Sequence, residues 1–509
     1  MRLVVGKREM QAMEKNVIEE IGIPSLVLME RAALAVCEQA RSMVTKEESI
    51  WVLCGSGNNG ADGIAAARML DLLGYSVTLL VTGDGSSGSI EYRKQLEIAT
   101  KLGLSIVSDE DFISCRKCSL LIDALFGIGL SREIEGELRK RMEELREKEI
   151  PKVLAVDLPS GVHADTGAWL GPVIPADVTV TFGWEKRGMA VYPGRTACGK
   201  IVIADIGFPE WEMWKQQPKA YTLEKEDLGQ LPQRRADSNK GSFGKVLIVA
   251  GSKNMSGAAY LSALAAYRSG AGLVRILTDE SNRQILQSQL PEAILSTYTP
   301  EELDREEAAV WAEELCSWAS VIVIGPGLSR EAFARKLLGL VLENAYVPII
   351  LDADGLNAVA DFPHLSSYFT DNIIVTPHLG EMARLTGKEI KELRANLYQA
   401  ARDYSDQYGV TCVLKDAATV VAFRDGTLYV NESGCSAMAK AGSGDVLTGI
   451  LAGLLACSLE EKQAISLGVY VHGLAGERAA QSCGDEGMLA RDLANEVGKV
   501  LMERKKKER

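Results

Sequence analysis

The sequence predicts a two-domain α/β protein, with a parallel sheet covered by helices on both faces in each domain. Its 509 residues are too many for one hydrophobic core, since domains usually hold about 150 residues. Short apolar runs alternate with amphipathic stretches, such as residues 60–73, 256–268 and 459–480, and this alternation is typical of parallel sheets. The polar, proline-containing segments 208–218 and 231–238 predict a linker region, so we place the domains at residues 1–218 and 219–509.

The composition is that of a globular protein, with 47% hydrophobic and 25% charged residues. The net charge of −13 argues against nucleic acid and anionic membranes as partners. No apolar run reaches the roughly 18 residues of a membrane-spanning helix, and residues 1–16 lack the apolar core of a signal peptide. We therefore expect a cytoplasmic protein. We also expect a homo-oligomer, since residues 9–43 have interrupted helical spacing that suits a cover for the sheet or a subunit contact.

The first strand of the N-terminal domain ends in a glycine-rich loop with polar side chains. Gly55-Ser56-Gly57-Asn58-Asn59-Gly60 follows the apolar run 50–54 and matches the G-x-G-x-x-G pattern of dinucleotide-binding domains. However, Asp62 in the first turn of the next helix would repel a pyrophosphate, and that pattern does not need two asparagine side chains. Amide and carboxylate oxygens instead suit a hard cation or a polar ligand.

Two further strands of this domain end in oxygen-bearing side chains. Asp123 ends the apolar run that begins at residue 120, and a glycine-rich loop follows it. Asp157 ends the run 153–156, and Ser160 comes three residues later. Each aspartate alone would be explained equally well by a turn or a helix cap. Three consecutive strand ends of this kind favour a binding or catalytic site.

The C-terminal domain contains a glycine-rich turn that opens an apolar helix, Gly442-Ser443-Gly444-Asp445. Its glycines allow backbone amides to face a ligand, and the helix start adds partial positive charge, so the turn suits a phosphate group. Asp445 alone would more often be a helix cap than a catalytic base. Other strands of this domain end at Gly327, His378 and Lys415, which favours a ligand site at one sheet edge and a catalytic role for Asp445.

Residues 240–488 resemble the ADP-dependent NAD(P)H-hydrate dehydratases, a branch of the ribokinase-like α/β fold. The resemblance is carried by KGSFGKVLIVAGS, IGPGLS, DADGLNAV, TPHLGEMARL, VLKDAATVV and AGSGDVLTGILAG, with departures at Ser329 and Gly355. It implies that Asp445 is the catalytic base and that ADP, accompanied by magnesium, is a co-substrate. It places the substrate on Ala258, Gly327, His378 and Asp445, and ADP on Lys415, Asp416, Ala417, Ala418, Thr419 and Gly444.

Residues 10–209 resemble the NAD(P)H-hydrate epimerases, through GSGNNGADG, DALFGIGLSREIEG, VDLPSGVHADTG and VTFGWEKRGMAVYPGR. This resemblance implies a Rossmann-like three-layer α/β/α domain in which Asn59, Asp123 and Ser160 bind a potassium ion. Asp157 would be the catalytic acid or base and a substrate contact. The rest of the hydrate would be lined by Asn58, Asn59, Gly60, Ala61, Asp62, Gly127, Ile128, Gly129, Leu130, Ser131, Arg132 and Glu133. Ala61 replaces the glycine that is usual in this family, and its methyl group could crowd the loop.

Together the two resemblances point to the bifunctional NAD(P)H-hydrate repair enzymes. Such an enzyme acts on NADHX and NADPHX, the hydrated forms of NADH and NADPH. Its first domain interconverts the R and S hydrates, and its second dehydrates the S form to NAD(P)H at the expense of ADP. The alternative is a ribokinase-like small-molecule kinase fused to a non-catalytic dinucleotide-binding module. The sequence leaves open the oligomeric state, the preference between the two hydrates and whether ATP replaces ADP.

Overall fold

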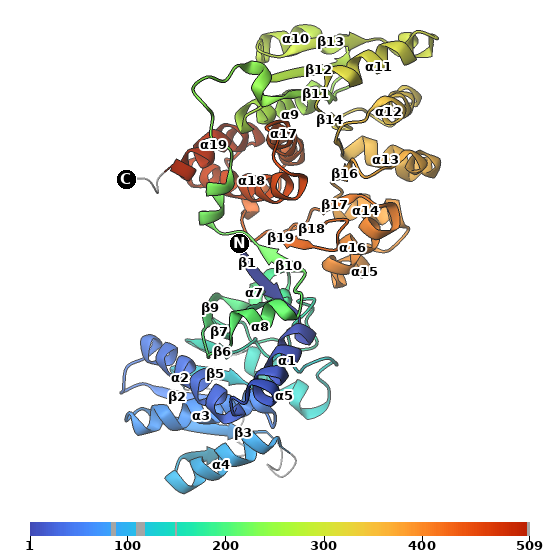
Figure 1. Ribbon diagram of the computed structural model, residues 1–509. Coiled ribbons are helices and arrows are strands. Elements are labelled where there is room, and N and C mark those ends of the chain that lie inside the picture. The colour runs from blue at the N-terminus through green and yellow to red at the C-terminus, as the bar shows by residue number, and fades with distance from the viewer. Residues whose placement is uncertain (83–87, 108–117, 148–149, 506–509) are drawn as a thin grey trace. The chain divides into compact units, whose positions relative to one another are not determined.

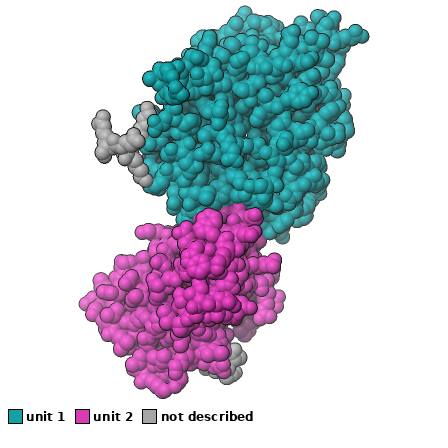
Figure 2. Space-filling view, viewed as in Figure 1, with its two compact units in different colours: residues 1–2, 221–509 teal, residues 3–220 magenta. Residues whose placement is uncertain are grey.

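The computed structural model describes residues 1–82, 88–107, 118–147 and 150–505 (Figure 1). Two compact units divide the chain: residues 3–220 form the N-terminal unit, and residues 1–2 with 221–509 form the C-terminal unit (Figure 2). Within the described residues, no helix combines the length and the hydropathy that a membrane crossing requires.

The N-terminal unit is built on a parallel sheet with the strand order β4-β3-β2-β5-β6-β7-β9. These strands are β2 (Ser49–Cys54), β3 (Ser76–Val81), β4 (Ser105–Val107), β5 (Leu120–Ala124), β6 (Val153–Val156), β7 (Val178–Phe182) and β9 (Lys200–Ala204). The chain builds outward from β2 to β4 and then returns to place β5 on the other side of β2. At such a switch point the loops after two neighbouring strands diverge and leave room for a ligand.

Helices cover both faces of this sheet, as the sequence predicts. Along β2, Val52 packs into a core with helices α1 (Lys7–Asn16), α2 (Ser25–Met43) and α3 (Asn58–Leu72). Leu53 points to the opposite face and packs with Met142 and Leu145 of α5 (Gly136–Arg146). The unit also contains α4 (Ile90–Leu102), α8 (Glu210–Lys215) and the short pair β1 (Arg2–Val5) and β8 (Glu185–Lys186). The Rossmann-like three-layer prediction is therefore confirmed.

The C-terminal unit has a longer sheet, with the order β13-β12-β11-β14-β15-β16-β17-β18-β19. The parallel strands are β11 (Lys245–Val249), β12 (Leu273–Asp279), β13 (Ile294–Tyr298), β14 (Val321–Ile324), β15 (Ile349–Leu351), β16 (Ile373–Val375) and β17 (Thr411–Leu414). The strands β11, β14, β15 and β16 are buried runs rich in valine and isoleucine, as strands covered on both faces should be, whereas the edge strand β13 is largely half-buried.

Two strands at the end of this sheet depart from the parallel arrangement. β18 (Val420–Ala422) runs antiparallel to β17, and β19 (Leu428–Val430) runs antiparallel to β18. The loops between them span only residues 415–419 and 423–427. A parallel return needs a crossover of a dozen or more residues, so these short loops allow only hairpins. The alternation of strands and helices elsewhere in the sequence did not reveal this local change.

One face of the C-terminal sheet is covered by α9 (Ser256–Ser269), α17 (Ser443–Ala456), α18 (Glu461–Cys483) and α19 (Ala490–Met502), whose apolar residues form one core with the strands. Helices α12, α13 and α14 lie across the sheet from α17 and α18 (Figure 1). The helices between the strands on that side are α11 (Ala308–Trp318), α12 (Ala332–Asn344), α13 (Ala353–Asp361), α14 (Leu379–Thr386), α15 (Ile390–Ala395) and α16 (Leu397–Tyr408). The fold confirms the ribokinase-like α/β prediction in its layers.

Candidate functional site

The glycine-rich loop after β2 is held tightly against the strand beside it. A Cβ on Gly55 would lie 2.1 Å from the carbonyl oxygen of Leu125, and a Cβ on Gly60 would lie 1.8 Å from the carbonyl oxygen of Gly55. These glycines are therefore required by close backbone packing. Ala61 is fully buried in the core among the strands and α3, so its methyl group is accommodated without entering the ligand space.

Asp123 and Ser160 meet where β5 and β6 end. The Ser160 hydroxyl donates to Asp123 Oδ1 at 2.6 Å, and the Ser160 amide donates to Asp123 Oδ2 at 2.8 Å. Asp123 is fully buried, and burial raises the pKa of its carboxyl group, while the bonds from Ser160 oppose the rise. The structure thus brings together two of the three residues that the sequence analysis assigns to potassium.

Asn59 lies at the start of α3 and faces the loop after β5. A Cβ on Gly127 would lie 3.0 Å from Asn59 Oδ1 and 3.1 Å from Asp157 Oδ2, so both oxygens converge on this glycine. The buried Asn59 Nδ2 has no hydrogen-bond partner among the described residues. Amide, carboxylate and hydroxyl oxygens are the donor types that suit a hard cation. The structure bonds Asp123 to Ser160 and places Asn59 Oδ1 beside Gly127 and Asp157. Among the described residues, no three His, Cys, Asp or Glu side chains gather as they would around a transition metal.

Asp157 follows β6 in a left-handed backbone conformation, with a φ of 66°. This conformation is uncommon for a residue with a Cβ and often marks a functional position. Lys186 Nζ lies 2.6 Å from Asp157 Oδ1, and the Thr181 hydroxyl donates to the same oxygen at 3.2 Å. Lys186 is 1% exposed and also donates to the carbonyl oxygen of Phe182 at 3.1 Å. The sequence analysis missed Lys186, although it lies within the run VTFGWEKRGMAVYPGR.

A cavity of about 540 Å³ is lined by Asn59, Asp157 and Lys186, whereas Asp123 and Ser160 are not among its described lining residues. Its acidic lining includes Glu14, Asp62 and Asp157, and Lys186 lies beside them. Burial, Asp157 and Glu14 hold the pKa of the Asp62 carboxyl group well above its usual range. Burial and Asp157 also raise the pKa of Glu14, although Lys186 opposes this effect. Glu14 lies within the helix α1, outside every strand-end motif of the sequence, so no local pattern marks it as a site residue.

The other predicted hydrate contacts divide into two groups. The cavity wall contains Asn58, Asn59, Asp62, Gly127, Ile128, Gly129, Leu130, Ser131 and Arg132. Among the described residues that line this cavity, Gly60, Ala61 and Glu133 are not found. Gly60 and Ala61 pack behind the loop, and Glu133 lines a separate surface depression with Arg139 and Trp169.

In the C-terminal unit, Asp445 is the third residue of α17, and Gly442 is the N-cap with a φ of 94°. The Asp445 carboxylate makes no hydrogen bond to a described residue, so the capping alternative has no support in the geometry. Burial and then the nearby Asp352 raise the pKa of Asp445 to about 7, while Lys415 opposes the rise. A carboxyl group with this pKa can act as a proton acceptor near neutral pH.

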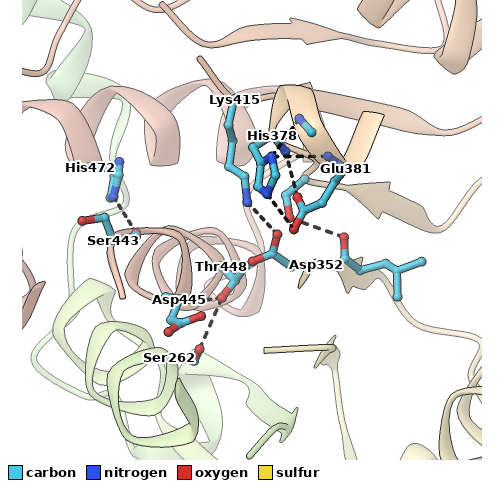
Figure 3. Close-up of polar contacts among 12 residues, drawn as sticks. Ser262, Asp352, His378, Glu381, Lys415, Ser443, Asp445, Thr448 and His472 are labelled. Carbon is cyan, nitrogen blue, oxygen red and sulfur yellow. Dashed lines mark hydrogen bonds and ion pairs between the residues drawn. The ribbon is translucent and has the colours of Figure 1, made fainter. Parts of the chain in front are cut away.

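Lys415, after β17, forms an ion pair with Asp352, after β15, at 2.7 Å (Figure 3). Burial lowers the pKa of Lys415, but Asp352 and Glu381 together raise it above its usual value. A Cβ on Gly444 would lie 3.5 Å from Lys415 Nζ and 3.8 Å from Asp352 Oδ2. Asp352 is 1% exposed and was not singled out from the sequence. Its signal was available, because it directly follows the apolar run of β15.

The other residues of the Lys415 loop diverge from this pair. Asp416 faces Arg394, with their charged atoms 3.6 Å apart, and Ala418 is buried. Ala417 is exposed, and Thr419 accepts a backbone bond from Asn431 at 2.9 Å. Only Lys415 of this loop is thus placed beside Gly444 in the structure.

His378 caps the helix that follows it. Its Nδ1 accepts hydrogen bonds from the amides of Gly380 at 2.9 Å and Glu381 at 3.3 Å, and Nε2 lies 3.3 Å from a carboxylate oxygen of Glu381 (Figure 3). Burial and then Lys415 lower the pKa of His378, which favours the neutral ring. Its side chain remains 53% exposed, so a ligand contact would use the open ring face.

His472 holds the start of α17 from the neighbouring helix α18. Its Nε2 lies 2.9 Å from the carbonyl oxygen of Ser443 (Figure 3). Burial lowers the pKa of His472 to about 4, so the ring is neutral and donates to this carbonyl. His472 is thus a packed helix residue that positions the turn before Asp445.

Ala258 and Gly327 lie next to each other. A Cβ on Gly327 would be 2.9 Å from the Cβ of Ala258, and Gly327 has a φ of 62°. Ala258 is in the first turn of α9, and Gly327 follows β14. Four residues therefore lie after the carboxyl ends of parallel strands of this sheet: Gly327, Asp352, His378 and Lys415. Ligands of α/β sheets usually bind at this edge.

Comparison with known proteins finds a match for each of the two units. Residues 246–499 match the family model of NAD(P)H-hydrate dehydratase, and residues 25–188 match that of the YjeF-related protein N-terminus. The bifunctional NAD(P)H-hydrate repair enzyme of Thermofilum pendens is 36% identical over 97% of this chain and 95% of its own length. That of Moorella thermoacetica is 37% identical over 98% of this chain and 96% of its own length.

Among solved structures, a ribokinase-like superfamily protein from Enterococcus faecalis is similar to the C-terminal part. It has a TM-score of 0.51 and 30% sequence identity, and the match covers 56% of this chain and 96% of that protein. The Escherichia coli bifunctional NAD(P)H-hydrate repair enzyme is 34% identical over 96% of this chain and 92% of its own length. On this near full-length similarity, the chain belongs to the family of bifunctional NAD(P)H-hydrate repair enzymes.

Proposed function

We propose that this chain repairs hydrated NADH and NADPH. Its N-terminal unit interconverts the R and S hydrates, and its C-terminal unit dehydrates the S hydrate with ADP as co-substrate. The observation that carries the proposal is the placement of Asp445 on a glycine-rich helix start beside the Lys415–Asp352 ion pair. A half-buried carboxylate, a lysine and the backbone amides of a helix start are groups that assist phosphoryl transfer to a hydroxyl.

In the dehydratase, hydroxide is a poor leaving group, so the hydroxyl is first converted to a phosphate ester. Asp445 accepts the hydroxyl proton while the terminal phosphoryl group of ADP moves to the oxygen and AMP is released. The phosphate then leaves with its C–O bond electrons, and the neighbouring carbon loses a proton to solvent, which forms the double bond of NAD(P)H. The amides of the turn before Asp445 hold the transferred group, and Lys415 holds the nucleotide phosphates. Magnesium bound with ADP would reduce the negative charge of those phosphates.

In the epimerase, Asp157 moves a proton at the hydrated end of the nicotinamide ring. Lys186 and Thr181 hold its Oδ1, so Oδ2 is the oxygen that faces Gly127 and the cavity. Asn59, Asp123 and Ser160 would hold a potassium ion, which supplies a fixed positive charge for the polar end of the substrate. The loop from Gly127 to Arg132 would cover the hydrate, since it lines the same cavity.

The dehydratase is tested by incubating the protein with NADH hydrate and ADP and following the absorbance of reduced nicotinamide. A rise that requires ADP supports the proposal. Accumulation of a stable phosphorylated product, with no return of this absorbance, would instead indicate a kinase. Repeating the assay with ATP and with NADPH hydrate establishes which nucleotide and which hydrate this chain prefers.

The epimerase is tested by following exchange between the R and S hydrates by NMR, without ADP. Asp157→Asn should abolish enzymatic exchange, while Asp123→Ala should weaken hydrate binding and remove its dependence on potassium. The matched control is Asp165→Asn, because Asp165 lies in the same unit outside the residues that line the cavity. Exchange that continues unchanged in Asp157→Asn refutes the catalytic role. Wild-type exchange that is the same in potassium and in a bulky organic cation removes the metal ion.

A further inference from the structure

A second cavity in the C-terminal unit, of about 760 Å³, lies away from the catalytic strand ends. Helices α9 and α17 both begin at the catalytic edge and both end at this cavity. Asp445 is in the first turn of α17, whereas Leu454 near its end and the following Cys457 line the cavity. A helix of 14 residues is about 20 Å long, so the cavity and the proposed dehydratase site are separate.

The charged side chains that line this cavity are mostly arginines. They are Arg234, Arg235, Arg268 and Arg504, with Asp237 as the one acidic residue among the described lining residues. Asp237 is already paired with Arg235 at 2.7 Å. No described residue forms an ion pair with the other three arginines. This local excess of positive charge contrasts with the net charge of −13 on the whole chain.

Two of these arginines are fixed in place by neutral partners. Arg234 donates to the carbonyl oxygen of Gly270 at 2.6 Å, and its guanidinium carbon lies 4.0 Å from the centroid of the Phe243 ring. Arg504 donates to the carbonyl oxygen of Pro232 at 2.6 Å, while its buried Nε has no partner among the described residues. Burial and then Arg234 lower the pKa of Arg504. The like charges of Arg234 and Arg504 thus lie close enough to interact, and no described carboxylate pairs with either of them.

A third cavity of similar size does not have this excess of positive charge. That cavity, of about 640 Å³, is lined by Asp304, Glu331 and Glu343 together with Arg335 and Lys336. Lys336 and Asp304 pair at 3.0 Å. Its charges are balanced by side chains of the protein itself, so it has no need for an anion.

We propose that the arginine cavity, lined by Arg234, Arg268 and Arg504, binds a small anion that carries a diphosphate group. Guanidinium groups present paired N–H donors that match phosphate oxygens, and three of them suit more than one phosphate. The cavity volume is also in the range that holds a phosphate ester rather than a single ion. This site is distinct from the proposed nucleotide site at Lys415, and it does not depend on the dehydratase activity.

Calorimetric titration of the full chain with inorganic pyrophosphate tests this site. Arg234→Gln should weaken binding at least tenfold, and Arg234→Gln/Arg504→Gln should remove it. Arg234→Lys should retain part of it, and higher salt should weaken it in the wild type. Arg330→Gln is the matched control, because Arg330 is an exposed arginine paired with Asp361 elsewhere in this unit. Pyrophosphate can also enter the proposed nucleotide site, so the heat lost in the double variant is the signal.

A second arm distinguishes the source of the diphosphate-type anion. Vesicles of phosphatidylcholine with and without a phosphorylated phosphatidylinositol are sedimented with wild type and double variant. Arginine-dependent sedimentation identifies a lipid headgroup, whereas arginine-dependent pyrophosphate heat alone identifies a soluble phosphate compound. If the double variant has a lower thermal stability, Arg268→Gln replaces it, since Arg268 is exposed. The proposal is overturned if two results occur together. The first is a pyrophosphate heat that is equal in all variants, or absent at millimolar pyrophosphate, and the second is vesicle binding that does not depend on the arginines.

Discussion

At the scale of single residues, the two carboxylates that we propose as catalytic have different surroundings. Asp157 is bonded to a fully buried lysine and to a threonine, which leave one carboxylate oxygen facing the cavity. Asp445 has no such partner, and burial beside Asp352 raises its pKa to about 7. The bonds to Lys186 and Thr181 fix the orientation of the Asp157 carboxylate. The surroundings of Asp445 instead raise its affinity for a proton. Each can be tested by one substitution.

Asp445→Asn should lower the dehydration rate by about 10² to 10⁴, because a general base is lost. This corresponds to roughly 3 to 5 kcal/mol of activation free energy. ADP should still bind, which is measured by titration. In the wild type, kcat/KM should rise as pH increases through about 7, the pKa at which Asp445 ionises. The control Asp361→Asn removes a surface carboxylate and should leave the rate unchanged. A near-normal rate in Asp445→Asn would show that Asp445 is not the base.

Asp445→Asn should lower the dehydration rate but raise the thermal stability of the protein at neutral pH. The folded-state pKa of Asp445 lies above its ordinary value of 3.8, so the native state binds more protons than the unfolded state between these values. The contribution of Asp445 to stability therefore falls as pH rises from about 4 to 7. Asparagine cannot ionise, so Asp445→Asn should have a higher Tm than wild type above pH 7 and no advantage below pH 4. An equal Tm difference at both pH values would contradict this electrostatic account.

Lys186→Met should stop epimer exchange and also destabilise the N-terminal unit. Removing one partner of a buried ion pair leaves the other charge uncompensated, which costs about 3 to 5 kcal/mol. Lys186→Met/Asp157→Asn removes both charges and should recover part of the lost Tm, while exchange stays absent. Dehydration of the S hydrate should remain in both variants. If the double variant is less stable than Lys186→Met, the buried pair is not the origin of the effect.

At the scale of secondary-structure elements, the placement of α17 decides the geometry of the dehydratase site. This helix packs against α9 through glycines: a Cβ on Gly449 would lie 2.2 Å from the carbonyl oxygen of Ser262, and one on Gly453 would lie 2.0 Å from Ser269 Oγ. The two helix axes can approach closely only because these positions have no side chain. His472 then holds the carbonyl of Ser443 at the start of the helix.

Gly449→Ala should therefore displace α17 from α9. Overpacking of this kind costs about 1 to 3 kcal/mol, so Tm should fall, and dehydration should slow because Asp445 moves with its helix. The matched control is Gly339→Ala in α12, where a Cβ would meet no atom within 4 Å. That change should raise stability by about 0.4 to 1 kcal/mol, since alanine restricts the unfolded chain more than glycine does. The Tm and the initial dehydration rate are measured for Gly449→Ala and Gly339→Ala. Equal Tm values and equal rates in the two variants would refute the packing argument.

At the scale of the whole molecule, each unit has its own core and its own candidate site. The N-terminal cores are formed by residues 3–213, and the large core around α17 is formed by residues 221–500. Residues 1 and 2 precede the N-terminal unit in the sequence but belong to the C-terminal unit. There Met1 pairs with Asp227, and Arg2 pairs with Glu224 and Glu432.

A fragment that begins at Lys219 should consume the S hydrate and leave the R hydrate to its slow spontaneous epimerisation. It lacks the ion pairs of Met1 and Arg2, but partly exposed pairs contribute only about 0 to 1 kcal/mol each. The fragment should therefore fold with a slightly lower Tm than the full chain. NMR of the remaining hydrates and thermal unfolding test both expectations. A soluble, folded fragment that cannot dehydrate the S hydrate would show that the C-terminal site is not self-contained.

The sequence by itself determined the layered α/β fold and the motifs at the strand ends. Mostly apolar runs of three to seven residues form the parallel strands of both sheets. Parallel strands place their carboxyl ends at one edge, so Asp123, Asp157 and Lys415 could be located without coordinates. The antiparallel end of the C-terminal sheet was missed because it depends on two short loops rather than on the strands themselves.

Only the tertiary structure decided which groups surround the two carboxylates proposed as catalytic. Glu14 lies on a helix near the N-terminus, Lys186 on a two-residue strand and Asp352 more than 60 positions before Lys415, yet each lies at a site assembled from distant segments. The sequence also could not show that Asp445 is buried beside another carboxylate, or that three arginines share one cavity. Local residue patterns set the strands and helices, but proton affinity and charge pairing depend on burial and distance, which arise only when the chain is packed.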